Sequence, residues 1–399
     1  MQGKTPKISS CRQRRAEKNS ALEKRFGMRY TENNRPLSFE GIAMTKNIVR
    51  ITTSVGLLIL TGVMVLLAKY INPVIFSFYP ALSRSIVGVL ATMTSVLPVP
   101  LCELLLAVLI VWMLVSLIRD IVRRRLLRWV TGMLLIGSLL LTAFVGIWGL
   151  NYYAPPMNER LNLPDPGYTA QELAEATSYY LDMANEYAPQ VARNADGTMR
   201  EIDFDTLSDA AGEGYEVLGK TMDEFDGAAV GVKKLLSSPI QGKIGMTGAF
   251  ICLTGESCVS STTYTANLPF TMCHEIGHAM AFARENEANF AAFLACSANE
   301  SPVFRYSGYY SAFRYCFNAL WRTDRNAAQE LQKRVCAEVK ADILAAQAHY
   351  AELENDTAKE LTDQVYDSYL KSFSVKSGVQ SYGEVTDLLL SWYFTRLRS

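Results

Sequence analysis

Residues 271–290 read TMCHEIGHAMAFARENEANF, and the rest of the chain must fold around this stretch. His274 and His278 are four residues apart, so on a helix both imidazoles lie on one face and can reach one ion. Glu275, beside the first histidine, can hold and deprotonate a water molecule at that ion. The neighbouring side chains are mostly uncharged, which is typical of a helix that is buried except where it meets the ion. The stretch therefore predicts a buried helix that carries metal ligands.

A catalytic zinc site needs a third protein ligand and one open position. Two acids that follow the histidines, Glu285 and Glu287, are the candidates. On one continuous helix Glu287 would lie about 13 Å from His278 and on the opposite side, so the chain must turn within 281–286. Glu287 is the preferred ligand, because the uncharged run after it then continues as a buried helix with Glu287 at its start. Glu285 is the competing ligand, and a chance spacing of the histidines with Glu287 on a solvated face is the alternative without a metal.

The charged residues are distributed unevenly, although the whole chain balances 39 Lys and Arg against 39 Asp and Glu. Residues 1–150 hold 19 of the basic residues and six of the acidic ones, which leaves residues 151–399 with a net charge of −13. A basic, apolar front and an acidic body are typical of a membrane anchor that carries a soluble domain. A nucleic-acid-binding protein would carry its basic residues on the folded body, so we expect no nucleic acid as a partner.

Three apolar stretches have about the 20 residues that a bilayer-spanning helix requires, and they are about 51–68, 101–118 and 129–150. Residues 76–98 are expected to form an interfacial or re-entrant helix. Five arginines lie in the loop between the second and third stretches, and short loops rich in Lys and Arg stay cytoplasmic. With three spans this loop and the basic N-terminus lie on the same side, whereas a fourth span within 85–97 would separate them. We therefore expect a multi-pass protein of the cytoplasmic membrane whose C-terminal domain is extracytoplasmic.

These observations divide the chain into three parts. Residues 1–47 are predicted to be a disordered basic leader, residues 48–150 a membrane anchor, and residues 151–399 an extracytoplasmic zinc metallohydrolase domain. That domain is expected to be mainly α-helical and zincin-like, with a small β-hairpin within 245–265. Its helices are predicted over about 169–191, 204–225, 268–282, 287–298, 302–322, 325–353, 357–373 and 382–397.

Several segments resemble one known family, the DUF3810 family of bacterial membrane proteins. The resemblance covers nearly everything after Met44, and its most specific segments are Cys273–Cys296, Thr254-Gly255-Glu256, Pro269-Phe270-Thr271 and Arg305-Tyr306-Ser307-Gly308-Tyr309. Residues 287–291, EANFA, are further similar to the third-ligand helix of gluzincin-type peptidases. The resemblance implies Zn²⁺ on His274, His278 and Glu287, with Glu275 as the base. Members of the family commonly have Gly where this chain has Ala281.

We expect a membrane-anchored, zinc-dependent metallohydrolase, namely a metallopeptidase that acts on a peptide or protein outside the cytoplasmic membrane. One alternative is a non-catalytic membrane scaffold or sensor that retains the HExxH fold. Another is an intramembrane protease with the motif inside the apolar run 266–283. The candidate oxyanion donors are Tyr306, Tyr309, Tyr310 and Arg305. Asn289 is a candidate to orient a metal ligand, and Glu256 is a candidate to line a peptide cleft. Cys252 and Cys258 are the candidate pair for a disulfide in the hairpin.

Overall fold

The computed structural model describes residues 39–164, 167–227, 231–353, 355–372 and 384–398. Residues 1–38 of the predicted leader lie outside the described residues, whereas residues 39–47 are helical rather than disordered. The chain divides into two compact units, which are Met1–Thr61 with Val111–Thr142 and Gly62–Ile110 with Ala143–Ser399.

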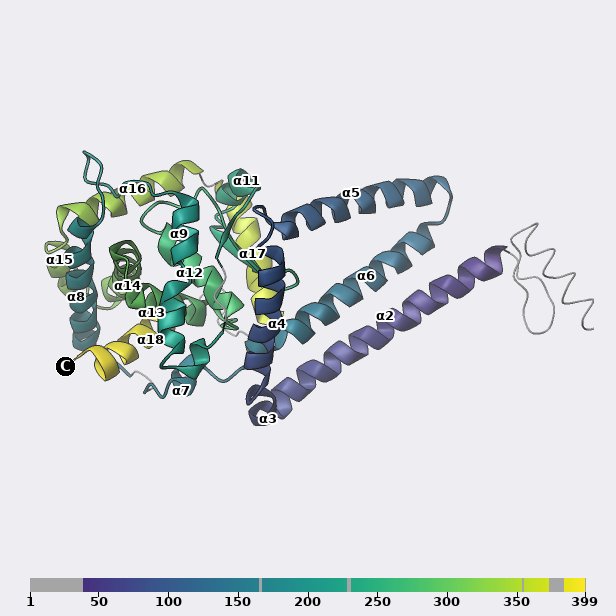
Figure 1. Ribbon diagram of the computed structural model, residues 1–399, viewed down its shortest axis with the longest axis horizontal. Helices are drawn as coiled ribbons and strands as arrows, with labels where there is room; N and C mark the ends of the chain where they lie inside the picture. Colours follow the sequence, from purple (N-terminus) through teal and green to yellow (C-terminus); the bar gives the residue numbers. More distant parts are fainter. Residues whose placement is uncertain (1–38, 165–166, 228–230, 354, 373–383, 399) are drawn as a thin grey trace, which may run out of the picture. The chain divides into compact units, whose positions relative to one another are not determined.

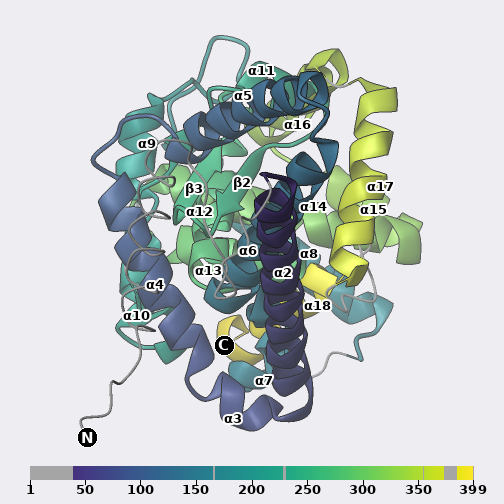
Figure 2. The same cartoon turned by 90° about the vertical axis from the view of Figure 1, so that its right-hand side faces the viewer.

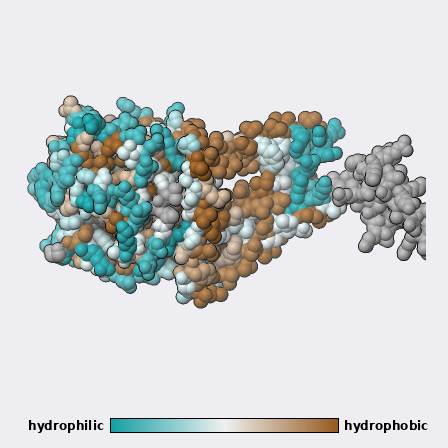
Figure 3. All heavy atoms as spheres, in the orientation of Figure 1, coloured by the Kyte–Doolittle hydropathy of each residue, from teal (hydrophilic) through white to brown (hydrophobic). Residues whose placement is uncertain are grey.

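Three helices are long and apolar enough to cross a membrane, and they are α2 (Phe39–Tyr70) over Met44–Tyr70, α5 (Leu101–Val122) and α6 (Leu126–Ile147). They contain the predicted spans, except that the third ends at Ile147, where the chain passes into the short 3₁₀-helix η1 (Gly149–Tyr153). Exposed Leu, Ile and Val cover these helices, which appear as the apolar (brown) surface in Figure 3. Such surfaces are typical of helices in contact with lipid, and they indicate a membrane protein.

Within the first unit, α5 and α6 are joined by the arginine-rich turn. Asp120 is buried there and pairs with Arg119 and Arg128 at 3.3 and 3.7 Å. Further along, the hydroxyls of Thr61 on α2 and Thr142 on α6 lie 2.9 Å apart. One acid therefore neutralises only part of the turn, which keeps a net positive charge.

The predicted interfacial segment, residues 76–98, contains one helix, α4 (Tyr79–Thr94), and a short helix, α3 (Asn72–Phe76), precedes it. One face of α4 is buried in the second unit, where Tyr79 donates to the carbonyl of Val145 at 3.1 Å and Ser83 to that of Ile147 at 2.8 Å. The opposite face exposes large apolar side chains, which are Leu82, Val89 and Met93. A helix that packs one face on the protein and exposes apolar side chains on the other is typical of a membrane interface.

The rest of the second unit is mainly helical (Figures 1 and 2). The predicted capping box is confirmed, because Thr169 and Glu172 each accept a backbone N–H of the other at the start of α8. Two predicted helices, 204–225 and 325–353, are each divided. The helices outside the metal region are α7 (Met157–Arg160), α8 (Ala170–Tyr187), η2 (Ala188–Gln190), α9 (Phe204–Ala210), α10 (Glu213–Gly219), η3 (Asp223–Phe225), α11 (Ser238–Lys243), α15 (Arg325–Gln332), α16 (Ala337–Leu353), α17 (Asp356–Ser372), α18 (Glu384–Trp392) and η5 (Tyr393–Leu397).

A small sheet lies beside the central helices. The predicted hairpin is confirmed as β2 (Gly248–Ile251) and β3 (Glu256–Val259), which pair antiparallel with Gly248 opposite Val259. A third strand, β1 (Lys233–Lys234), runs parallel to β3 and was not predicted, because two residues carry no alternating pattern. The order β1-β3-β2 leaves β2 at the edge of the sheet.

The central helices are α12 (Leu268–Ala279), α13 (Glu285–Ala298) and α14 (Pro302–Thr323), and α13 is buried from Glu285 to Cys296. Small residues let neighbouring helices approach it closely. A Cβ on Gly214 of α10 would lie 1.9 Å from the carbonyl oxygen of Ala295, and one on Gly308 of α14 would lie 2.6 Å from the Cβ of Cys296. This close packing holds α13 against α10 and α14.

Candidate metal centre

The two histidines lie one turn apart on the buried helix α12, as predicted. Their ring centroids are 4.7 Å apart and the rings are nearly perpendicular, at 88°. His278 is buried and His274 is partly exposed. Because Glu275, Ile276 and Gly277 between them are buried as well, the polar atoms of this helix face a protected site rather than bulk solvent.

A tight turn follows α12, within the interval that the sequence analysis required. Ala281 has a φ of 72°. The N–H of Phe282 donates to the carbonyl of Gly277 at 3.1 Å, and the N–H of Ala281 donates to the carbonyl of His278 at 3.0 Å. These bonds form a Schellman motif, which usually has Gly at the left-handed position. The turn is therefore made at Ala281 without a glycine, and it directs the chain back along α12.

The turn brings Glu285 to the histidines. Its two carboxylate oxygens lie 3.3 Å from Nε2 of His274 and 3.5 Å from Nε2 of His278. Within the described ranges, these three residues form the one group of His, Cys, Asp and Glu that could hold a metal ion, with ligand atoms within 4.8 Å of one another. Two ligands about 2.0–2.1 Å from a tetrahedral zinc ion lie about 3.3–3.4 Å apart, so the donor set fits zinc in kind and in spacing.

Glu287, the preferred third ligand from the sequence, lies elsewhere. Its carboxylate pairs with Arg160 at 3.0 Å and Arg284 at 2.7 Å, and it accepts the N–H of Met157 at 3.0 Å. The reason is the start of α13, which begins at Glu285 and not two residues later. At about 100° per residue, Glu287 then points about 200° away from Glu285 around the helix. The geometry therefore places the competing Glu285, and not the preferred Glu287, beside the two histidines.

Hydrogen bonding orients His278 toward Glu285. Its Nδ1 lies 2.8 Å from the carbonyl oxygen of Phe282, which can only accept, so Nδ1 carries a proton and Nε2 can offer a lone pair. Burial lowers the pKa of His278, but the hydrogen bond and charge of Glu285 outweigh it and raise the pKa to about 9. Burial likewise opposes ionisation of Glu285, yet its hydrogen bonds to His274 and His278 hold its pKa well below the ordinary value. Without a metal the group is a tight acid–imidazole cluster.

Glu275 lies beside this cluster with one oxygen uncommitted. Its Oε2 is buried and has no hydrogen-bond partner in the part of the chain that the structure describes. Burial raises its pKa, and the nearby His274 and His278 reduce that rise. A Cβ on Gly248 of β2 would lie 2.4 Å from Oε1 of Glu275, so this glycine leaves the space that the carboxylate occupies. A carboxylate with a raised pKa next to a metal site is suited to take up a proton.

A cleft of about 590 Å³ opens over the site, lined by His274, Glu275, His278 and Glu285. One wall comes from Ile244–Phe250, which includes the edge strand β2. Another comes from α14 through polar and aromatic side chains, which are Ser311, Arg314, Tyr315 and Asn318. Asn289 lines the cleft as well, one turn after Glu285 on the same face of α13, as expected for a residue near the ligands.

A third wall of the cleft comes from the segment that follows α6, which the sequence analysis did not connect with the site. Phe144, Trp148 and Tyr152 line it. Nε1 of Trp148 donates to the carbonyl of His278 at 2.8 Å, and the two rings are 6.1 Å apart in an edge-to-face arrangement. The four-residue spacing of these aromatics indicates that they share one face of a helical segment, but it does not show which part of the protein that face contacts.

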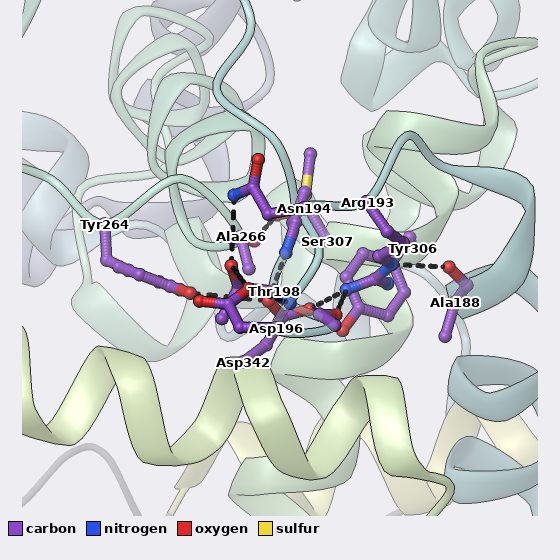
Figure 4. A network of polar contacts seen from close by, with 12 residues as sticks. Ala188, Arg193, Asn194, Asp196, Thr198, Tyr264, Ala266, Tyr306, Ser307 and Asp342 are labelled. Atoms are coloured by element: carbon purple, nitrogen blue, oxygen red, sulfur yellow. Dashed lines mark hydrogen bonds and ion pairs between the residues drawn. The ribbon is translucent and has the colours of Figure 1, made fainter.

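The proposed oxyanion donors do not line the cleft. Tyr306 is buried and donates to Asp342, which also pairs with Arg193 and accepts from Tyr264 (Figure 4). Arg305 donates to the carbonyl of Asn299 at 2.6 Å, Tyr309 stacks on Tyr187, and Tyr310 lies under Arg314. Arg305, Tyr306, Tyr309 and Tyr310 therefore have packing roles, and Arg314 and Tyr315 replace them as groups that face the cleft.

Glu256 and the cysteines also have structural positions. Glu256 is buried, pairs with Lys233 at 2.7 Å, and accepts the N–H groups of Leu101 and Cys102 at 2.8 and 2.7 Å, so it does not line the cleft. The seven cysteines among the described residues are free thiols. Cys258, which the sequence analysis considered for a bridge to Cys252, has its sulfur 4.0 Å from that of Cys102.

Comparison with known proteins gives one match. Neither the curated proteins nor the solved structures contain a significant match to this chain. The sequence profile of the family described as protein of unknown function (DUF3810) matches residues 77–390, which include α4, the sheet and every residue of the metal centre. The match covers more than half of the chain, and the chain therefore belongs to the DUF3810 family.

Proposed function

We propose that this protein is a membrane-anchored zinc metallohydrolase, and specifically a metallopeptidase. The observation that carries the proposal is the group His274, His278 and Glu285, with ligand atoms within 4.8 Å of one another beneath an open cleft. Two imidazoles and one carboxylate form a ligand set of catalytic zinc sites, which keep a further position for water or substrate. Glu275 adds the acid–base group that hydrolysis requires.

The chain's own groups have distinct roles in the proposed reaction. When bound, zinc supplies a Lewis acid that polarises a carbonyl and lowers the pKa of water. Glu275 takes the proton from the attacking water, and its raised pKa favours this transfer. It then returns the proton to the leaving nitrogen. Arg314 and Tyr315, on the opposite wall, are the candidates that stabilise the negative charge on the carbonyl oxygen.

The edge strand favours a polypeptide substrate over a small molecule. β2 pairs with β3 along one side only, and Gly248, Ala249 and Phe250 line the cleft. An extended peptide can add to such an edge through backbone hydrogen bonds, which fix the scissile bond without demanding one sequence. The position of Glu275 against Gly248 brings the proposed base next to that strand.

Metal content and hydrolysis together test the proposal. We expect the purified full-length protein in detergent to hold one zinc per chain, and to cleave a mixed fluorogenic peptide library. Glu275→Gln should keep the zinc and lose about 100-fold or more of the hydrolysis, because general acid–base groups contribute on that scale. His274→Ala should lose both. Glu330→Gln, at an exposed position on α15, is the matched control and should change neither.

The competing function is a non-catalytic scaffold or sensor with the same fold. It predicts that Glu275→Gln keeps the zinc and leaves any measured hydrolysis unchanged. That result would reject the enzyme, whereas absence of zinc from the protein expressed with ample metal would reject the metal centre itself.

The proposed location is the cytoplasmic membrane, with the body extracytoplasmic. The support is the arginine turn between α5 and α6, since such turns remain cytoplasmic. In intact cells a membrane-impermeant maleimide should label Lys333→Cys, at an exposed position directly after α15, and should not label Arg124→Cys in the turn. The parent chain, which has partly exposed Cys102 and Cys336, is the blank. The opposite labelling pattern would reverse the orientation.

A further inference from the structure

The ends of all three apolar helices belong to the same unit as the metal centre. Residues 62–70 of α2, 101–110 of α5 and 143–147 of α6 are part of the second unit. The helix α4 lies in the chain between the end of the first span and the start of the second, so we expect it at the level where these spans leave the membrane. Its free face carries exposed Leu82, Val89 and Met93, as expected of a helix lying on lipid.

Three contacts join α12 and the hairpin to α6, α5 and α4. Trp148, the first residue after α6, donates to the carbonyl of the candidate ligand His278 at 2.8 Å. Glu256 of β3 accepts the first two N–H groups of α5. At the tip of the hairpin, a Cβ on Gly255 would lie 2.5 Å from the backbone nitrogen of Ala91 in α4, so backbone packs on backbone there. The helix α12 and the hairpin are therefore held at the membrane boundary by three separate elements.

The lining of the cleft changes in character with distance from that boundary. Phe144 belongs to the last turn of the third span. The centroid of its ring is 5.9 Å from that of Trp148, which in turn is 5.5 Å from that of Phe250. The wall from α14 instead presents Arg314 and Asn318. An apolar wall at the membrane end and a polar wall from the body suit a chain that emerges from lipid into water.

We infer that the substrate is a polypeptide anchored in the same membrane, cut just outside the bilayer. The inference rests on the proposed function and narrows its substrate. The ring of Trp148, directly after the third span, lies 6.1 Å from that of His278, which is the length of about two residues of an extended chain, so the cut falls close to the bilayer surface. One water is consumed: its oxygen bonds to the acyl carbon, the C–N bond breaks, and the leaving nitrogen receives the proton held by Glu275.

A stalk of identical repeats tests the position of the cut. The stalk carries six copies of one cleavable segment, chosen from the library, joined to a single Leu/Ala transmembrane helix. The full-length enzyme and this substrate are reconstituted into vesicles of phosphatidylethanolamine and phosphatidylglycerol, and mass spectrometry identifies which repeat is cut. The same stalk without its transmembrane helix is the soluble form, and Glu275→Gln enzyme is the background.

We expect the repeat nearest the bilayer to be cut at least tenfold faster than the outermost one, and the soluble stalk to be cut slowly at all repeats. Equal cutting of every repeat, with the soluble stalk cut as fast as the anchored one, overturns this inference while the metallopeptidase stands. Release of products from the vesicle lipids, without stalk cleavage, would assign the cleft to lipid and also overturn it. If neither the anchored nor the soluble stalk is cut in a Glu275-dependent way while the peptide library still is, only this inference is overturned. If neither the stalks nor the library are cut, the metallopeptidase is rejected as well.

Discussion

Nε1 of Trp148 donates a hydrogen bond of 2.8 Å to the backbone carbonyl of His278, which joins the end of the third apolar helix to the candidate metal centre. Trp148→Phe keeps an aromatic ring in place and removes this donor. The carbonyl of His278 keeps the N–H of Ala281, so the loss should be only about 1 kcal/mol. Thermal unfolding in detergent measures it, with the exposed Trp112→Phe as the control. An unchanged unfolding midpoint would show that this bond contributes nothing.

Replacing Glu285 should weaken zinc binding, whereas replacing Glu287 should lower stability. Glu285→Gln removes a proposed ligand, so zinc binding should fall by at least 100-fold. Glu287→Gln removes the buried carboxylate that pairs with the partly buried Arg160 and Arg284 and should cost about 3 kcal/mol, with zinc stoichiometry unchanged at low temperature. Zinc analysis and thermal unfolding of the two variants, measured side by side, check this. If Glu287→Gln lost the metal and Glu285→Gln kept it, the assignment of the third ligand would be reversed.

Ala281 should tolerate glycine better than its neighbour does. Both Ala281 and Ala283 are buried, but only Ala281 has a positive φ, of 72°. In Ala281→Gly the relief of left-handed strain, about 1–2 kcal/mol, offsets the loss of a buried methyl group and the added chain entropy. Ala283→Gly has no such compensation and should be less stable by about 1 kcal/mol. Denaturant unfolding compares the two, and equal losses would mean that Ala281 carries no strain.

Gly248→Ala should damage hydrolysis without affecting the metal. The added Cβ would lie 2.4 Å from Oε1 of Glu275 and must displace this carboxylate, whereas the three ligands are on other elements. We expect a fall of about tenfold or more in peptide hydrolysis, with zinc content as in the parent chain. Gly167→Ala, where nothing lies within 4 Å, is the control. Full activity of Gly248→Ala would show that Glu275 is not held against the strand during the reaction.

The pH dependence of stability should include a contribution from Glu256. Burial raises its pKa, but the ion pair with Lys233 and the N–H groups of Leu101 and Cys102 outweigh this and lower it. A depressed folded-state pKa stabilises the protein above the unfolded value, about 4.3, and that stabilisation is lost as the pH falls through the lower, folded pKa. Unfolding midpoints from pH 7 to pH 3 measure the effect. Glu256→Gln should be less stable at pH 7 and should lose less stability on acidification; a parallel curve for both proteins would contradict this.

Much of the fold could be predicted from local patterns. The apolar stretches, the capping box at Thr169 and the hairpin all depend on residues close in sequence, and the structure contains them. The errors lie where tertiary packing decides an element's ends. Helix 325–353 is divided and α13 begins at Glu285, since the buried face of each helix is set by neighbours far away in the chain.

The sequence by itself determined that His274 and His278 share one face of a helix, because their spacing is a property of the helix alone. It also determined that the chain must turn before the third acid can return. Only the tertiary structure decided which acid returns, because the start of α13 and the arginines around Glu287 fix the rotation of that helix. It alone brought Trp148 against His278, since this contact joins residues 130 positions apart and no local pattern encodes it.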